Sequence, residues 1–377
     1  MAPSRTDNDH HEPPAPKTTY DINVPYSKPD DLETLRGRTE FPEYLAVWEP
    51  NLWFDSDFPV FEYHDPALRA DKAKPNLFQP GVTIKHITPR MGSVLTGIKL
   101  ETLSPAAKDE LALLISERKI VAIREQSSFL HSGPSFQENF MEYFGKLSTQ
   151  PVSGAIKGHP NFHIIHRDNN EEEIAKFFKH KSTSTLWHHD VSYERQPPGY
   201  VMLGIMACPE VGGDTVFADT AMAYKRLSPT FQAMIDNLKA VHTSRKMIAH
   251  VRAARGAIRA DPIDSIHPIV RVHPVTGERA IFLNAEFLDE IVGLKENETE
   301  LILKFLMDHV SKGHDFQCRV QWEKHSVVMF DGRNTQHTAT VDYDSRVQAR
   351  HLFRLAAMTE VPLSVEDSQK EIIDGPA

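Results

Sequence analysis

The stretch Trp187-His188-His189-Asp190-Val191-Ser192-Tyr193 sets the expected fold and site of this chain of 377 residues. His188 and Asp190 are two residues apart, so on an extended strand their side chains project from the same face. An imidazole nitrogen and a carboxylate oxygen placed in this way can bind one cation. His189 would project from the opposite face of a regular strand, so we expect it to pack inside the protein.

Two side chains do not complete the coordination of a divalent ion, so a third ligand must come from elsewhere in the chain. The segment Gly332-Arg333-Asn334-Thr335-Gln336-His337 supplies the best candidate, His337. Two histidines and one carboxylate on one side of an ion are the ligands of non-haem Fe(II) oxygenases, which keep coordination positions open. A His-X-Asp pair alone is weak evidence, because the chain has 20 histidines and such pairs arise by chance.

Two arginines that follow His337 strengthen this interpretation. Arg350 and Arg354 are four residues apart, so on a strand they share a face with Leu352 and stand roughly 13 Å apart. Two guanidinium groups in the interior are costly unless anions neutralise them, and arginine binds carboxylates in a bidentate manner. We therefore expect a small dicarboxylate beside the metal, with the hydroxyl of Thr215 as a further donor. An edge strand with both arginines in water is the alternative.

Composition and charge narrow the class of protein. The net charge of −10 argues against general binding to nucleic acid or to a membrane surface, because both select for clustered lysine and arginine. Two cysteines, Cys208 and Cys318, are too few for a disulfide framework, which suits a reducing compartment such as the cytosol. No stretch approaches the roughly 20 apolar residues of a membrane span.

Many short strands, with helices gathered in a few places, indicate a mainly β fold with flanking helices (α+β), a β-sandwich or jelly roll. We predict a hairpin over 82–100 and strands at 120–124, 162–166, 200–206, 212–219, 267–272, 279–283, 316–322, 326–330 and 347–356. We predict helices at 106–118 with Ser104 as the cap, and at 136–144, 221–227, 229–238 and 297–310. The polar segment 167–185 is well placed to act as a mobile lid, and the irregular segment 252–264 to cross the mouth of the site.

Four regions are expected along the chain. Residues 1–19 are rich in Pro, Asp and His, which predicts a disordered tail. Residues 20–81 are interrupted by prolines and aromatic residues, which favours an N-terminal extension that wraps around the protein. Residues 82–360 make up the predicted jelly-roll domain, and residues 361–377 a C-terminal tail.

Taken together, these motifs resemble those of the taurine dioxygenase family of Fe(II)/2-oxoglutarate oxygenases. The resemblance also includes Pro197-Pro198, Asn284 and Ile291-Val292-Gly293-Leu294, and it spans residues 82–358 in consistent order. It implies a double-stranded β-helix, a cupin-like jelly roll with the metal in its mouth. It further implies Fe(II) as the metal, and 2-oxoglutarate and O2 as co-substrates. The long N-terminal region looks like that of fungal members acting on sulfonates or sulfate esters.

Carried over to this sequence, the resemblance assigns the metal and co-substrate residues. His188, Asp190 and His337 bind iron. Arg350 corresponds to the arginine that holds the distal carboxylate of 2-oxoglutarate, with Thr215 beside it. Arg354 corresponds to the arginine that approaches both the substrate anion and the other end of the co-substrate.

The resemblance also points to substrate-binding positions. Val191 stands where the family directs a backbone N–H towards the substrate anion, and Phe287 where an aromatic ring lines the pocket. Gln150 and Ser153 replace a histidine and a tyrosine of taurine enzymes, and Ser184 stands near a family asparagine. Because those family residues bind taurine, the departures weaken the case for taurine itself.

The predicted function is oxidation of a small anionic substrate, a sulfonate or sulfate ester, with decarboxylation of 2-oxoglutarate to succinate and CO2. The alternative is a tailoring oxygenase of secondary metabolism that hydroxylates or cyclises an amino acid or another small carboxylate with the same cofactors. A non-catalytic metal-binding or regulatory protein is a third possibility, against which the complete triad and both arginines argue. We expect a cytoplasmic homo-oligomer, a dimer or a tetramer.

Overall fold

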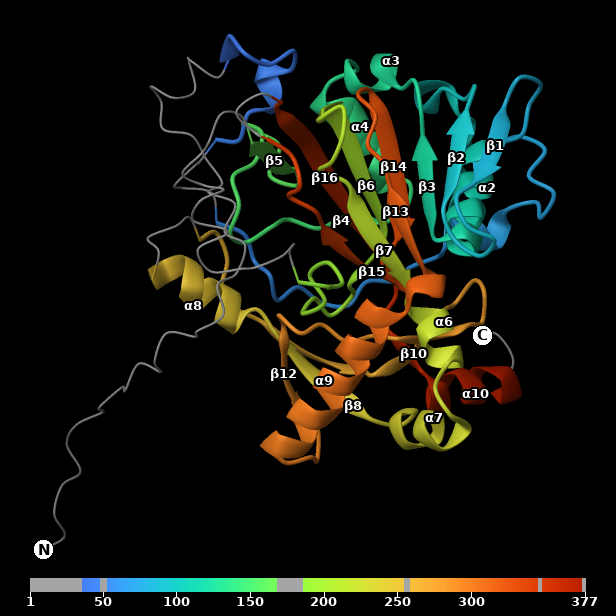
Figure 1. The fold of residues 1–377 in the computed structure, drawn as a ribbon, viewed down its shortest axis with the longest axis vertical. Coiled ribbons are helices and arrows are strands. Elements are labelled where there is room, and N and C mark those ends of the chain that lie inside the picture. The colour runs from blue at the N-terminus through green and yellow to red at the C-terminus, as the bar shows by residue number, and fades with distance from the viewer. Residues whose placement is uncertain (1–35, 48–52, 168–185, 254–257, 345–347, 375–377) are drawn as a thin grey trace, which may run out of the picture.

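The computed structural model describes residues 36–47, 53–167, 186–253, 258–344 and 348–374. One large sheet, a small sheet that faces it and several helices form an upper part, and two further small sheets with most of the remaining helices form a lower part (Figure 1). The predicted tail 1–19 and nearly all of the predicted lid 167–185 lie outside the described residues. Within the described ranges, no helix is both long enough and apolar enough to cross a membrane.

A mixed sheet of eight strands is the centre of the upper part. The strands run in the order β1-β2-β3-β14-β6-β16-β4, and β5 also pairs with β16. All pairs are antiparallel except β2 with β3. The strands are β1 (Thr83–His86), β2 (Ser93–Thr96), β3 (Ile120–Ile123), β4 (Lys146–Leu147), β5 (His163–Arg167), β6 (Pro198–Ala207), β14 (Ser326–Asp331) and β16 (Arg350–Met358). They confirm the predicted hairpin and the strands predicted at 120–124, 162–166, 200–206, 326–330 and 347–356.

Successive residues of the central strands point to opposite faces of the sheet, as the period of a strand requires. In β6, Tyr200 and Met202 join the apolar core on one face, whereas Val201 and Leu203 join the core on the other. Both faces are therefore buried, which explains why these strands are continuous apolar runs in the sequence.

A second sheet faces the main sheet and completes the jelly roll. It consists of β13 (Gln317–Val320), β7 (Thr215–Asp219) and β15 (Thr335–Ala339), with β7 in the middle. The rings of Phe217 on β7 and Phe330 on β14 meet with centroids 5.2 Å apart, inside the core between the two sheets. The sequence did not predict β15, because Thr335-Gln336-His337-Thr338-Ala339 lacks the apolar alternation typical of a strand.

Helices cover the other face of the main sheet. They are α2 (Pro105–Arg118) and α4 (Pro134–Glu142), and the short helix α3 (Ser127–Leu130) lies at the upper end of the sheet (Figure 1). Ser104 caps α2 as predicted, since its hydroxyl accepts a hydrogen bond from a first-turn N–H. The chain before β1 packs against the same core. Tyr44 is fully buried there, and its ring stacks on Phe353 of β16 at 5.6 Å.

Two more three-stranded sheets and most of the remaining helices make up the lower part. The sheets have the orders β12-β8-β9 and β11-β10-β17. The elements are β8 (Lys239–Thr243), β9 (Asp264–Pro268), β10 (Val270–Val272), β11 (Arg279–Ile281), β12 (Leu288–Ile291), β17 (Leu363–Ser364), α6 (Thr220–Lys225), α7 (Pro229–Ile235), α8 (Arg245–Ala253), α9 (Glu296–Lys312) and α10 (Val365–Asp374). Short 3-10 helices lie at Pro42–Tyr44, Pro66–Arg69, Leu100–Thr102 and His314–Phe316.

The lower part differs most from the sequence predictions. The single strand predicted at 267–272 is wrong, because the chain passes from β9 in one small sheet to β10 in the other at Ile269. β8, α8 and β12 were not predicted. The region 361–377 contains β17, which pairs with β10, and α10. The helices predicted at 221–227, 229–238 and 297–310 correspond to α6, α7 and α9.

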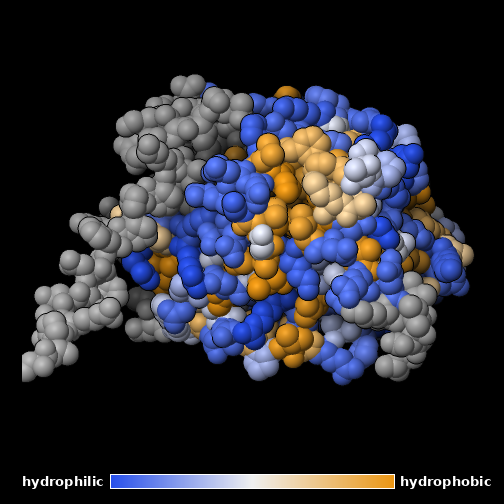
Figure 2. All heavy atoms as spheres, turned by 90° about the horizontal axis from the view of Figure 1, so that it is seen from below, coloured by the Kyte–Doolittle hydropathy of each residue, from blue (hydrophilic) through white to orange (hydrophobic). Residues whose placement is uncertain are grey.

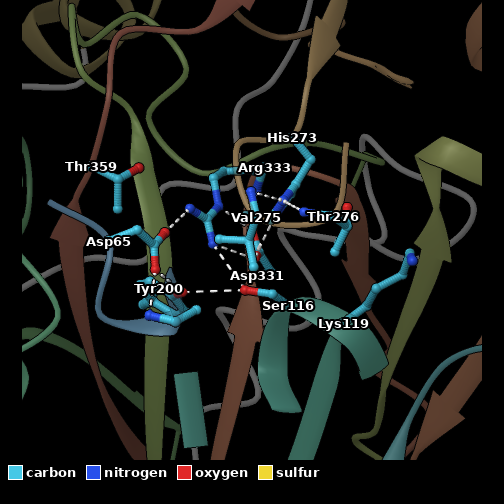
Figure 3. Close-up of polar contacts among 12 residues, drawn as sticks. Asp65, Ser116, Lys119, Tyr200, His273, Val275, Thr276, Asp331, Arg333 and Thr359 are labelled. Carbon is cyan, nitrogen blue, oxygen red and sulfur yellow. Dashed lines mark hydrogen bonds and ion pairs between the residues drawn. The ribbon is translucent and has the colours of Figure 1, made fainter. Parts of the chain in front are cut away.

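A buried ionic network supports the turn between β14 and β15 (Figure 3). Arg333 in this turn donates to Asp331 at the end of β14 and to Asp65 from the segment before β1. His273 donates through Nε2 to Asp331 at 2.9 Å, and its Nδ1 accepts from the backbone N–H groups of Val275 and Thr276. Burial would raise the pKa of Asp331, but Arg333 and His273 hold it far below its usual range.

Candidate metal centre and active site

Three side chains from separate parts of the sequence converge at one end of the jelly roll: His188, Asp190 and His337. Their ligand atoms all lie within 4.8 Å of one another. His188 Nε2 and Asp190 Oδ1 are 3.9 Å apart, and the centroids of the two imidazole rings are 4.2 Å apart. Two imidazoles and one carboxylate on one side of an ion suit Fe(II) and keep other coordination positions open.

The hydrogen bonds around these residues keep atoms available for an ion. His188 donates through Nδ1 to the carbonyl oxygen of Leu186 at 2.8 Å, which leaves Nε2 as its ligand atom. Asp190 Oδ2 and His337 Nδ1 are buried and have no hydrogen-bond partner within the described part of the chain. Buried polar atoms without a partner are costly, so the three residues fit a bound metal ion.

Main-chain pairing fixes the two histidines relative to each other. The N–H groups of His188 and His337 each donate to the other residue's carbonyl oxygen, at 3.1 and 3.0 Å. The regular strand predicted around His188 is wrong, because His188 alone is paired and a turn begins at Asp190. Val191 in this turn has a φ of 35°, which is strained for a β-branched residue. Strain of this kind is often found at binding sites.

His189 supports the metal-binding stretch from behind. Its side chain is buried, and its Nδ1 donates to the carbonyl oxygen of Gly332 at 3.0 Å. Asn284 donates through Nδ2 to the carbonyl oxygen of His189 at 2.6 Å. The predicted packing role of His189 is thus confirmed. One hydrogen bond joins the stretch to the turn before β15, and the other joins it to the segment after β11.

Charges near the metal-binding residues keep Asp190 ionised. Burial alone would raise the pKa of Asp190, but neighbouring charges, with Arg354 as the largest contributor, lower it to about 2. Arg354 donates to Asp190 Oδ1 at 2.7 Å. Burial also lowers the pKa of His337 to about 3, so its imidazole is neutral. A carboxylate and neutral imidazoles are the protonation states that metal binding requires.

A cavity of about 220 Å³ opens beside the three residues, between the main sheet and the β13-β7-β15 sheet. Within the described part of the chain, every residue with a predicted site role lines this cavity: Gln150, His188, Asp190, Val191, Thr215, Phe287, His337, Arg350 and Arg354. Ser153, noted as a departure from taurine enzymes, lines it as well. Ser184 lies outside the described residues.

The strand β16 presents its arginines as the sequence predicted. Arg350, Leu352 and Arg354 all line the cavity, so they share one face of the strand. Thr215 begins β7 on the opposite wall and is paired with Ala339 of β15. An anion in the cavity therefore meets guanidinium groups on one wall and a hydroxyl on the other.

Several residues of the cavity were missed in the sequence. His163 and Arg167 of β5, Glu286, and Met247 and Val251 of α8 all line it. His163 and Ile165 alternate within the predicted strand 162–166 and so share one of its faces, whereas Arg167 was predicted to begin the polar segment 167–185 and proves to end β5. The sequence held no sign of which strand β5 pairs with, so their approach to Arg350 and Arg354 was not foreseen.

A jelly roll with two histidines, a carboxylate and inward-facing arginines around one cavity defines an Fe(II)- and 2-oxoglutarate-dependent dioxygenase. A family model described as "Taurine catabolism dioxygenase TauD, TfdA family" matches residues 83–356. The chain belongs to this family, and the predicted fold class and chemistry are confirmed.

Known relatives and a solved structure agree with this assignment. The chain is 40% identical to an alpha-ketoglutarate-dependent sulfonate dioxygenase of Saccharomyces cerevisiae, over 89% of this chain and 81% of the relative. It is 38% identical to the alpha-ketoglutarate-dependent dioxygenase cnsM of Penicillium expansum, over 86% and 90%. The crystal structure of a taurine dioxygenase from Burkholderia xenovorans superposes with a TM-score of 0.62 at 28% identity, covering 76% of this chain and 94% of that one.

Proposed function

We propose that this dioxygenase acts on a small monoanion, a sulfonate or a sulfate ester. The charge of the cavity carries the proposal. Among the described residues that line it, the ionisable side chains of fixed sign are three arginines and two acids: Arg167, Arg350, Arg354, Asp190 and Glu286. The net charge of these side chains is +1. Bound Fe(II) would raise the net charge of the cavity to +3, and the two carboxylates of 2-oxoglutarate would lower it to +1 again. A singly charged substrate makes the filled site neutral, which a low-dielectric interior favours.

The side chains of the protein position the substrate and the co-substrate, and the bound iron would supply the reactivity. Arg350 and Thr215 hold the distal carboxylate of 2-oxoglutarate across the cavity, and Arg354 holds the anionic head of the substrate beside Asp190. When bound, Fe(II) with 2-oxoglutarate and O2 oxidises the nearest C–H bond and releases succinate and CO2. A sulfonate hydroxylated on the carbon next to sulfur then expels sulfite and leaves an aldehyde. A sulfate ester releases sulfate in the same way.

Charge also bears on the alternative, a tailoring oxygenase for amino acids or other carboxylates. A simple carboxylate has the required single charge and fits the arginine equally well. An amino acid with one carboxylate is a zwitterion, so it brings no net negative charge to a cavity lined by three arginines and two acids. The sulfonate reading is also supported by the name of the yeast relative.

A succinate-release screen with Fe(II), ascorbate and 2-oxoglutarate tests the proposal. Alkanesulfonates, alkyl sulfates, simple carboxylates and amino acids are compared, and sulfite and sulfate are measured beside succinate. We expect substrate-dependent succinate together with sulfite from sulfonates or sulfate from esters. His337→Ala, which removes a metal ligand, should abolish turnover with every substrate. Succinate release that depends only on amino acids or carboxylates would overturn the proposed substrate class.

The homo-oligomer and the cytoplasmic location stay predictions. Apolar side chains reach the surface of the lower part on α9, where Leu301 is 72% and Phe305 is 45% exposed. The face of the molecule seen from below also carries apolar atoms near its middle (Figure 2). Such surfaces support the dimer or tetramer expected from the sequence.

A further inference from the structure

The cavity wall formed by β5 and β16 has two polar ends and an apolar middle. The register pairs Arg350 with Arg167, Leu352 with Ile165, and Arg354 with His163. All six side chains line the cavity. Residues paired directly across an antiparallel ladder have their side chains side by side on one face. Each arginine of β16 therefore has a polar neighbour on β5, and the neighbour of Arg354 is His163.

The described residues of the protein leave the hydrogen-bonding capacity of the His163 side chain unused. Neither ring nitrogen has a hydrogen bond to any residue in the described ranges, and Nδ1 is buried. By contrast, His188 donates to Leu186 and His189 donates to Gly332. A buried polar group with no partner is a cost to the folded protein, and a ligand in the cavity can remove that cost.

The protonation state of His163 determines what it can offer. Burial, with a further contribution from Arg354, lowers the pKa of His163 to about 3, so the ring is neutral and carries one N–H. A buried N–H group without an acceptor is rarer than a buried acceptor without a donor. The hydrogen therefore belongs on Nε2, and the sealed Nδ1 is the unprotonated nitrogen. His163 is then a donor that adds no charge to the cavity.

We propose that the Nε2–H group of His163 donates a hydrogen bond to the anionic head of the substrate, and that His163 and Arg354 together select three-oxygen anions over carboxylates. Arg354 already uses Nη1 on Asp190, so fewer of its donors remain for the substrate. A sulfonate or sulfate ester presents three terminal oxygens, whereas a carboxylate presents two. A neutral donor beside Arg354 serves the third oxygen and preserves the charge balance. This inference rests on the proposed function.

Steady-state kinetics of three variants test the role of His163. His163→Phe keeps the ring shape and removes the donor. His163→Gln places an amide N–H where Nε2–H stood. His166→Phe is the matched control, because His166 lies on the same strand but does not line the cavity. For each variant, KM and kcat are measured for an alkanesulfonate, for the carboxylate of equal chain length and for 2-oxoglutarate.

We expect His163→Phe to raise the KM for the sulfonate at least tenfold and to lower the preference for sulfonate over carboxylate by a similar factor. Its KM for 2-oxoglutarate should stay within twofold of wild type, which separates a defect in substrate binding from a defect in co-substrate binding. His166→Phe should keep the slow substrate-independent succinate release of wild type. His163→Gln should restore the sulfonate KM to within threefold, and His166→Phe should leave it unchanged.

An unchanged sulfonate KM in His163→Phe would overturn the inference while the proposed function stood. So would a defect confined to the KM for 2-oxoglutarate, because His163 would then serve the co-substrate. If the wild-type protein turned over neither sulfonates nor sulfate esters, the proposed function would fail and the inference with it.

Discussion

Glu194 lies in the turn after the metal-binding stretch, with its side chain buried. Burial raises its pKa to about 8, and Lys146 opposes the shift only in part. The folded protein therefore keeps this carboxyl group protonated at neutral pH. Because the pKa in the folded state is above the ordinary value of 4.5, unfolding releases a proton above pH 4.5. The stability contributed by the neutral carboxyl is complete below pH 4.5 and is lost as the pH rises towards 8.

Glu194→Gln replaces the carboxyl with a group of similar shape that stays neutral. Each unit of pKa shift corresponds to about 1.4 kcal/mol, so the variant should gain several kcal/mol of stability relative to wild type at pH 9. It should gain almost nothing at pH 4.5. Thermal unfolding followed by circular dichroism at both pH values measures the difference. Glu290→Gln, at an exposed position, is the control. An equal Tm change at both pH values would contradict the assignment.

Residue spacing within one segment was enough to predict part of the site. His188 and Asp190 share a face because they are two apart, and Arg350 and Arg354 because they are four apart. His163 could not be found in the same way. Its role depends on the pairing of β5 with β16 across nearly two hundred residues, and local periodicity carries no information about that register.

Among the elements, the turn between β14 and β15 depends on a partner distant in sequence. Asp65 accepts hydrogen bonds from Arg333 in this turn and, at 2.7 Å, from the hydroxyl of Tyr200. Arg333 is fully buried, so it needs its carboxylate partners to offset the loss of water. The segment before β1 thus helps to hold the turn that leads to His337.

Asp65→Asn should lower the free energy of unfolding by about 3 kcal/mol, because it removes the charge from one of the buried carboxylates that pair with Arg333. Urea unfolding of the variant and of wild type gives the value. Asp315→Asn is the control, since its ion pair with Arg226 is more than half exposed on both sides and should contribute less than about 1 kcal/mol. Equal effects of the two substitutions would show that the buried network does not stabilise the protein more than a surface pair.

Helices and strands were predicted correctly where the apolar pattern of the sequence matched the burial of the residues in the folded protein. The apolar strands β6 and β14 and the capped helix α2 are examples. The strand β15 was not predicted from the sequence, because its residues are polar and it is stabilised by pairing with β7 and by the network around Arg333. The break at Ile269 was not predicted, because the apolar pattern of the sequence does not change where the chain passes from one sheet to another.

At the scale of the whole molecule, the segment before the jelly roll is part of its core. Phe41 and Tyr44 are fully buried, and Tyr44 meets Phe353 on the outer face of the strand that carries Arg350 and Arg354. The sequence suggested a wrapping extension from its prolines and rings. It did not reveal that these rings lie directly behind the cavity wall, because that contact joins residues about three hundred positions apart.

The main-chain hydrogen bonds between His188 and His337 place the two metal-binding histidines side by side without the help of an ion. The backbones of the two histidines are joined by hydrogen bonds to each other and not through the ion, so departure of the ion does not break this contact. Chelation with EDTA should therefore leave the far-UV circular dichroism unchanged and lower Tm only by the mass-action contribution of the ion. Activity should return on addition of Fe(II) without a refolding step. Loss of β-sheet signal on chelation would mean that the metal itself assembles this end of the fold.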